Sequence, residues 1–268
     1  MVTISTPDKF LGSLMGAYIG HHYLEKYQGK WLSVSKSPLY NVWLSSIEPQ
    51  NIPSLLATSS IPTAIPWLLY HHDDCTGRIH WLNQALAYST TNGDHHASLY
   101  SNRIKVLYIL GDCLEWLMQC PKDAQDPHLD LCHHLRQQQS TSPSAIIPQL
   151  NQLIQTLASP SLDSYLQTLD HTEPSFMALT SALKRCMYYR ENLALALSRS
   201  DLTAPTPTLI GCLLGAWRGP SVLPIDWVMA IPQDSKEALR HMAQQLYCSW
   251  AGLKSKIPGT YEIFPLDF

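Results

Sequence analysis

The pattern of apolar and polar positions predicts a chain built almost entirely of α-helices. In most segments apolar residues recur three and four positions apart, which is the spacing of one helix face. Convincing alternation with a period of two, the pattern of a half-buried strand, is absent, although residues 257–268 read as a short extended tail. The expected helices span residues 7–26, 63–72, 78–90, 93–119, 127–139, 145–158, 161–169, 175–190, 191–199, 206–218 and 235–252. We therefore expect an all-α, compact multi-helix bundle.

Two segments of low complexity interrupt this pattern without dividing the chain. Residues 121–127 and 137–148 are rich in proline, serine and glutamine, a composition typical of loops. They isolate the expected helix 127–139, so the segment 121–148 is a candidate insertion or mobile cover. We expect residues 1–268 to form a single domain.

Two of the expected helices carry the same stripe of glycines. In Phe10–Gly20 and again in Leu209–Gly219, three glycines recur at positions i, i+4 and i+8, which lie on one helix face. Each glycine costs about 1 kcal/mol of helix stability relative to alanine. Small residues at this spacing let the backbone of a neighbouring helix approach closely. The stripes therefore predict tight helix packing.

The order of four segments resembles a known family. Phe10–Gly20 is similar to a Phe-x-Gly-x-Leu-x-Gly-x-x-x-Gly-Asp opening, and Pro62–Tyr70 to a pocket segment Asn-Gly-x-x-Met-Arg-x-x-Pro. Thr91–Ala97 is similar to a Thr-His-Gly-Asp turn, and Glu191–Trp227 ends in a match to Ile-Pro-x-x-Trp. Together they resemble the ADP-ribosylglycohydrolase family, which includes the dinitrogenase-reductase activating glycohydrolases. The resemblance implies an all-α fold, and in the family a hydrolase with two divalent metal ions.

The resemblance also implies that this chain has lost the Mg²⁺ or Mn²⁺ ligands of that family. Such cations prefer oxygen ligands, carboxylates among them. The positions of one Asp-x-Asp-Thr cluster are held by Leu202, Ala204 and Pro205. In the stretch that should hold the other cluster, residues 26–72, the only acidic residue is Glu48. We therefore expect no metal cofactor and a catalytically inactive member of the family.

The family's pocket positions are changed as well. Thr58, Ser59 and Thr63 stand where the resemblance places Asn, Gly and Arg, and Asn92 stands where it places the histidine of the turn. His21 replaces the aspartate after the first glycine stripe. The four residues Thr58, Ser59, Thr63 and Asn92 are the candidate ligand-binding positions.

One pair of residues is the candidate for a remnant polar site. If the two glycine helices meet as the resemblance implies, His21 and Asp201 face each other, an arrangement suited to acid–base chemistry. Asp73 and Asp74 are further carboxylates for a rebuilt site. An active hydrolase of ADP-ribosyl linkages, N- or O-glycosidic, is thus the alternative to the inactive protein.

A third group of candidate residues lies on the expected helix 127–139. His128 and Cys132 are four positions apart, as are Asp130 and His134, so each pair shares a helix face and has the residue types that bind transition metals. A solvated polar helix face explains the same pattern. The sequence leaves open whether His128, Cys132 and His134 bind a metal.

Composition and charge exclude several functional classes. With 18 basic residues and a net charge of −3, the chain lacks the basic surface of a nucleic-acid-binding protein. The most apolar long segment, Ile104–Met118, contains Lys105, Asp112 and Glu115 and is too polar to span a membrane. The motifs of serine-nucleophile elbows and phosphate loops are missing. Seven cysteines without a CxxC pair and no signal-peptide pattern are typical of a reduced, cytoplasmic protein.

Three functions remain. The first is an inactive glycohydrolase-like binding or regulatory module, whose partner is another protein or an ADP-ribose-type small molecule. The second is the active hydrolase. The third is a scaffold subunit, because only 15% of the residues are charged and an obligate interface is depleted of charge.

Overall fold

The computed structural model describes residues 5–23, 43, 60–91, 97–121, 124, 126–140, 142–159, 173–198 and 202–253. In this part of the chain there are eleven α-helices, two 3-10 helices and no strand, which confirms the all-α prediction. The elements are α1 (Thr6–His21), η3 (Ile61–Ala64), α5 (Ile65–Tyr70), α6 (Cys75–Thr91), α7 (Ala97–Gln119), α8 (Pro127–Gln138), α9 (Ile147–Ala158), α11 (Pro174–Tyr188), α12 (Leu193–Leu197), α13 (Thr206–Arg218), η4 (Gly219–Val222), α14 (Ile225–Ala230) and α15 (Gln233–Trp250).

Most helix boundaries lie within a few residues of the predicted ones. Two differ: α1 ends at His21, earlier than expected, and the expected helix 63–72 is a 3-10 turn followed by the six-residue α5. The short helix α14 was not predicted. The expected helix 161–169 and the extended tail 257–268 lie outside the described residues.

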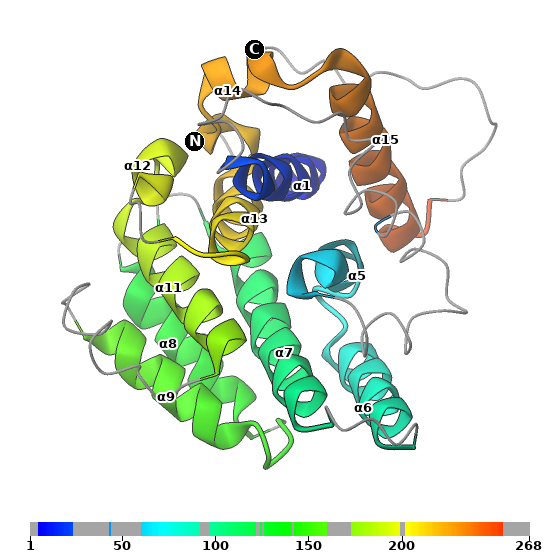
Figure 1. Cartoon of the computed structure of the whole chain (residues 1–268), viewed down its shortest axis with the longest axis vertical. Coiled ribbons are helices and arrows are strands. Elements are labelled where there is room, and N and C mark those ends of the chain that lie inside the picture. The colour runs from blue at the N-terminus through cyan, green and yellow to red at the C-terminus, as the bar shows by residue number, and fades with distance from the viewer. Residues whose placement is uncertain are drawn as a thin grey trace.

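The two glycine helices, α1 and α13, lie side by side at the centre of the bundle (Figure 1). They are antiparallel: Gly12 faces Gly215, Gly16 faces Gly211, and Gly20 faces Pro207. A Cβ atom added to Gly16 or Gly211 would lie closer than 3.0 Å to backbone atoms of the opposite helix. The predicted close approach is therefore present, and we call this contact the glycine seam.

Both helices of the glycine seam are enclosed on all sides. Every residue of α13 is buried, as is every residue of α1 from Lys9 to Gly20. In Figure 1, α15 flanks the seam on one side and α11 on the other. At the end of α13, Gly219 adopts φ 66°, and its N–H bonds to the Gly215 carbonyl, which ends the helix where the Gly-Pro sequence predicts.

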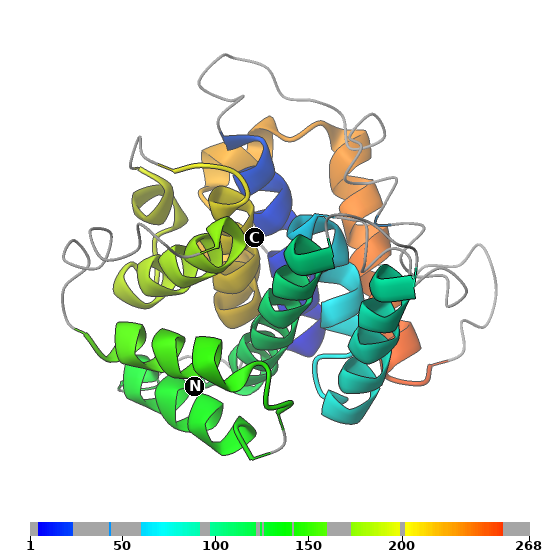
Figure 2. The same ribbon diagram turned by 60° about the horizontal axis from the view of Figure 1, so that its bottom comes forward.

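Helix α7 is the second central element. Figure 2 shows it between α6 on one side and the pair α8 and α9 on the other. At its C-terminal end, the Lys9 ammonium from α1 donates hydrogen bonds to the carbonyls of Leu117, Met118 and Cys120 at 3.1, 2.9 and 3.2 Å. The last carbonyls of a helix have no N–H donor within the helix itself. The buried Lys9 supplies the donor here and so caps α7 from a different part of the chain.

Candidate functional site

The three positions before α13 to which the resemblance assigns metal ligands, Leu202, Ala204 and Pro205, carry apolar side chains, and the first turn of the helix adds the buried Thr206 and Thr208. Leu202 is buried, and the carbonyl of Pro207 lies against Gly20 of α1. His21 is exposed at the end of α1. Its proposed partner Asp201 lies outside the described residues, so that pair stays a prediction.

Of the four candidate ligand-binding residues, the structure describes only Thr63. Its side chain is buried in the first turn of η3, where the hydroxyl donates to the carbonyl of Ser60. This hydrogen bond gives Thr63 a local structural role. Thr58, Ser59 and Asn92 lie outside the described residues.

The three metal candidates of α8 point to three different neighbours. The Cys132 thiol is buried, 3.8 Å from the carbonyl of Ile154 on α9. The His128 ring lies against the backbone of Met187 on α11, and the His134 ring lies against the backbone of Asp112 on α7. Burial lowers the pKa of both histidines. Packing therefore separates the residues that helical spacing grouped together.

Within the described part of the chain, no group of three or more His, Cys, Asp or Glu side chains is placed to hold a metal ion. The same residues contain no helix that is long and apolar enough to cross a membrane.

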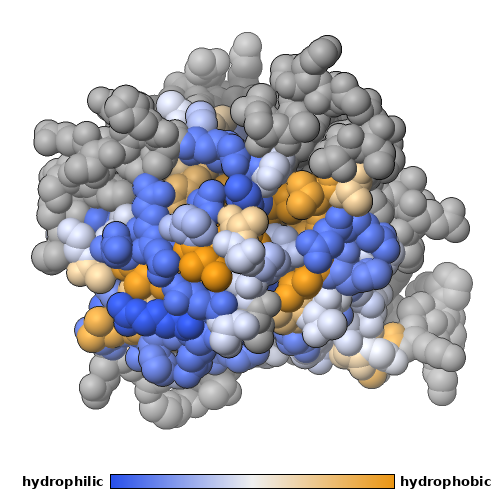
Figure 3. All heavy atoms as spheres, turned by 90° about the horizontal axis from the view of Figure 1, so that it is seen from below, coloured by the Kyte–Doolittle hydropathy of each residue, from blue (hydrophilic) through white to orange (hydrophobic). Residues whose placement is uncertain are grey.

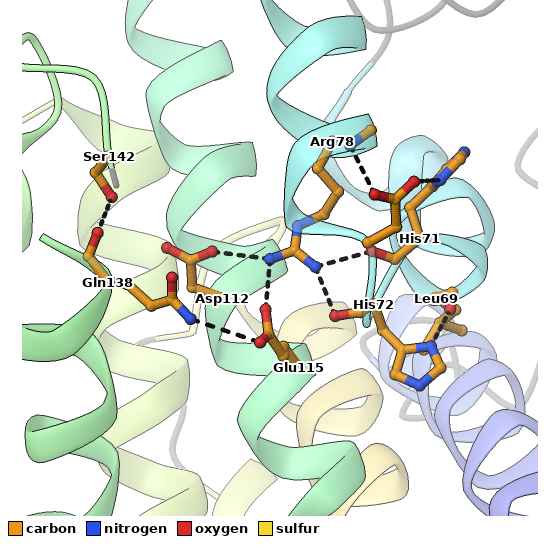
Figure 4. Close-up of polar contacts among 10 residues, drawn as sticks. Leu69, His71, His72, Arg78, Asp112, Glu115, Gln138 and Ser142 are labelled. Atoms are coloured by element: carbon orange, nitrogen blue, oxygen red, sulfur yellow. Dashed lines mark hydrogen bonds and ion pairs between the residues drawn. The ribbon is translucent and has the colours of Figure 1, made fainter. Parts of the chain in front are cut away.

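The most concentrated polar chemistry lies between α6 and α7, centred on Arg78 (Figure 4). The Nη2 of Arg78 donates to Asp112 Oδ1 at 2.9 Å and to Glu115 Oε2 at 2.8 Å. Its Nη1 donates to the carbonyls of His71, at 2.8 Å, and His72. We call Arg78, Asp112 and Glu115 the Arg78 cluster. The exposed fraction of the three side chains is 2%, 9% and 15%, so the charges lie away from bulk water.

The sequence of α7 makes room for this cluster. The Arg78 side chain crosses α7 at Gly111, where an added Cβ would lie 2.8 Å from Nε and 3.0 Å from Cδ. Asp112 and Glu115 follow on the same helix, three positions apart, so they share a face and meet the same guanidinium. Gly111 thus positions Arg78 between two carboxylates.

Burial and charge act in opposite directions on the carboxyl group of Asp112. Loss of water raises its pKa most, Arg78 lowers it and the nearby Glu115 raises it, and together these effects bring the pKa to about 6. The pKa of Arg78 is lowered by burial but raised more by Glu115 and Asp112, and lies above its usual value. The guanidinium is therefore a fixed positive charge, whereas Asp112 is a group that can change its charge.

Polar contacts extend from the cluster on both sides. On α8, Gln138 donates to Glu115 Oε1 at 3.5 Å. On the α5 side, His71 Nδ1 lies 3.6 Å from Asp74, and the His72 ring bonds to the Leu69 carbonyl. Burial lowers the pKa of both His71 and His72, so these rings are neutral at pH 7 at the end of α5.

Asp73 and Asp74, the carboxylates suggested for a rebuilt site, both serve local structure. Asp73 accepts a hydrogen bond from the Trp250 indole at 2.9 Å, and Asp74 accepts one from the Gly77 N–H at 2.8 Å, at the start of α6. Neither is part of the Arg78 cluster.

The chemistry of the Arg78 cluster is that of an interior charge network rather than of an open active site. Both terminal nitrogens of Arg78 donate to carboxylates and carbonyls, and each group of the cluster is mostly buried. It connects α6, α7, α8 and the turn after α5. The cluster was not predicted from the sequence, although Asp112 and Glu115 stand out as carboxylates in the apolar C-terminal half of α7.

The surface offers a different kind of feature on α14. Ile225 and Met229 are four positions apart and are 68% and 70% exposed, so they share one outward face. The other side of α14 is anchored by Trp227, whose ring lies 5.7 Å from that of Tyr23. The opposite side of the molecule is mostly hydrophilic, with several separate apolar areas (Figure 3).

The chain matches no model of a known protein family, no curated protein and no solved structure.

Proposed function

We propose that this protein is a non-catalytic binding protein with an ADP-ribosylglycohydrolase-like bundle, and that its partner is another protein. Two features support the inactive part of the proposal. Leu202, Ala204 and Pro205 have no side-chain group that ligates a metal, and the backbone of Pro207 at the start of α13 packs directly against Gly20 of α1. Function depends on such a site more than on the fold.

The exposed apolar face of α14 is the observation that supports binding to another protein. Ile225 and Met229 are the two most exposed large apolar side chains among the described residues. They project from a helix that is held in place by Trp227, so their exposure does not come from a loose segment. Apolar side chains on an anchored element are typical of protein contacts.

Capture from the source cell, with quantitative mass spectrometry, tests this proposal. The double variant Ile225→Ser and Met229→Ser should lose a partner that the unaltered protein enriches. The matched control is Leu129→Ser on α8, which removes an apolar side chain that is 59% exposed from another helix and should retain the partner. Equal enrichment by both variants would remove α14 from the proposal.

Calorimetry with ADP-ribose separates a protein partner from a small molecule. We expect no binding with Mg²⁺, with Mn²⁺ or with a chelator. Binding that is independent of metal would identify a sensor for ADP-ribose-type ligands. Binding that requires the metal would favour the active hydrolase and overturn the inactive assignment.

A further inference from the structure

The Arg78 cluster has an imbalance of charge. Arg78 contributes one positive charge, and Asp112 and Glu115 contribute two negative charges when both are ionised. All three meet at one nitrogen atom, because Nη2 of Arg78 donates to both carboxylates. Two carboxylates that share a buried site do not both ionise readily, since each disfavours the charge of the other.

The neighbouring titratable groups do not supply a second positive charge. Burial raises the pKa of Cys75 on α6 and of Cys113 on α7, and raises that of Tyr108 to about 12, so these groups stay neutral. Burial lowers the pKa of His134 on α8, so its ring is neutral at pH 7 as well. The same holds for His71 and His72 in the turn after α5.

We propose that the Arg78 cluster is a proton-binding switch: Asp112 takes up one proton from mildly acidic solution while the chain stays folded, and this changes the charge that holds α6 and α8 against α7. The proton removes the excess negative charge and leaves Arg78 paired with Glu115. The site is built by three helices, so the proton acts on their packing rather than on a single side chain.

The contacts of α8 explain how the charge of the cluster reaches the surface. Gln138 bonds to Glu115, and the carbonyl of Gln138 accepts a hydrogen bond from Ser142 at 2.8 Å in the turn that follows α8. The His134 ring of α8 lies against the backbone of Asp112 itself. A change at the cluster therefore acts directly on the C-terminal half of α8.

The sign of the effect on stability follows from the direction of the shift. The pKa of Asp112 is about 6 in the folded chain and near 3.8 when the carboxyl group is exposed to water, as in the unfolded chain. The folded state therefore binds the proton more tightly. The stabilisation from this group is complete below the unfolded pKa and is lost as the pH rises through about 6. Acidification from neutral pH thus favours the folded state at Asp112, the reverse of the usual behaviour of a paired aspartate.

The experiment compares urea unfolding of the unaltered protein and Asp112→Asn between about pH 7 and about pH 4.5. The amide has the shape of the carboxyl but does not titrate. As the pH falls, the unfolding constant of the unaltered protein should drop relative to that of the variant, approaching about tenfold per pH unit below pH 6. Asp130→Asn, which removes an exposed carboxylate from α8, is the control and should show no such drop.

The proposal is overturned if the ratio of the two unfolding constants, unaltered protein to Asp112→Asn, is independent of pH or rises as the pH falls. If Asp112→Asn does not fold, the carboxyl resonance of Asp112 in the unaltered, isotope-labelled protein decides the matter. A measured pKa of Asp112 above the ordinary range of aspartates supports the switch, and a pKa within or below that range contradicts it.

Discussion

The glycine seam and the Arg78 cluster hold the same bundle together by opposite means. The seam joins α1 and α13 through backbone atoms that approach because side chains are missing. The cluster joins α6, α7 and α8 through long charged and polar side chains that meet in the interior. The seam has almost no freedom to adapt, whereas the cluster can change its charge. A rigid centre beside an adjustable contact is what we would expect of a protein that binds and responds.

Adding side-chain atoms to the glycine seam should cause the largest loss of stability. Gly16→Ala and Gly211→Ala each place a methyl group where the opposite backbone lies. A backbone cannot rotate away as a side chain can. We therefore expect each variant to lose more free energy of unfolding than the typical cost of an overfilled core, which is about 1–3 kcal/mol. Urea unfolding followed by circular dichroism measures the loss. A cost below about 1 kcal/mol would show that the two helices can separate freely.

Removing the cation of the cluster should have the next largest effect. Arg78→Met leaves two buried carboxylates without their partner, which should cost about 3 kcal/mol near neutral pH. Without Arg78 the pKa of Asp112 rises further, so the cost should shrink as the pH falls towards 5, where the carboxyl is protonated. The control is Arg136→Met, which removes an exposed arginine from α8. A cost that grows on acidification would contradict this account.

The lysine that caps α7 provides an intermediate test. Lys9→Met keeps the aliphatic stem but leaves three carbonyls at the end of α7 without their donor. We expect a loss of about 1–3 kcal/mol in the free energy of unfolding. Hydrogen exchange should also become faster in the last turn of α7. Unchanged exchange there would mean that other donors replace the ammonium group.

The smallest effect is expected where a glycine meets a side chain instead of a backbone. In Gly111→Ala the added methyl group meets the Arg78 side chain, which can shift at the expense of its hydrogen bonds. We expect a cost of about 1–2 kcal/mol, below that of Gly211→Ala. Thermal unfolding of the two variants side by side gives the order. An equal or larger cost at Gly111 would show that the cluster is as rigid as the seam.

The glycine seam could be predicted from the sequence and the Arg78 cluster could not, for a physical reason. The seam is a local pattern repeated twice, with glycines at fixed spacing, so each half could be recognised in isolation. Arg78 and Asp112 are ordinary residue types 34 positions apart, and only the packing of α6 on α7 brings them together. Helix α14 was missed because six residues after Pro224 are too short to show a periodicity.

The candidate site was predictable only in part. That Leu202, Ala204 and Pro205 carry no metal-ligating group follows from their identities alone. On α8, helical spacing grouped His128 with Cys132, but it could not show that these side chains pack against different helices. A shared helix face is necessary for a two-ligand site and does not determine what lies opposite it.

The most direct test of the central claim, that this bundle binds without catalysing, is an assay for release of ADP-ribose. The purified protein is incubated with an ADP-ribosylated protein substrate in the presence of Mg²⁺ or Mn²⁺, beside a sample without the protein. We predict no release above that background. Release that depends on the protein and stops when a chelator is added would contradict the account and establish the active hydrolase.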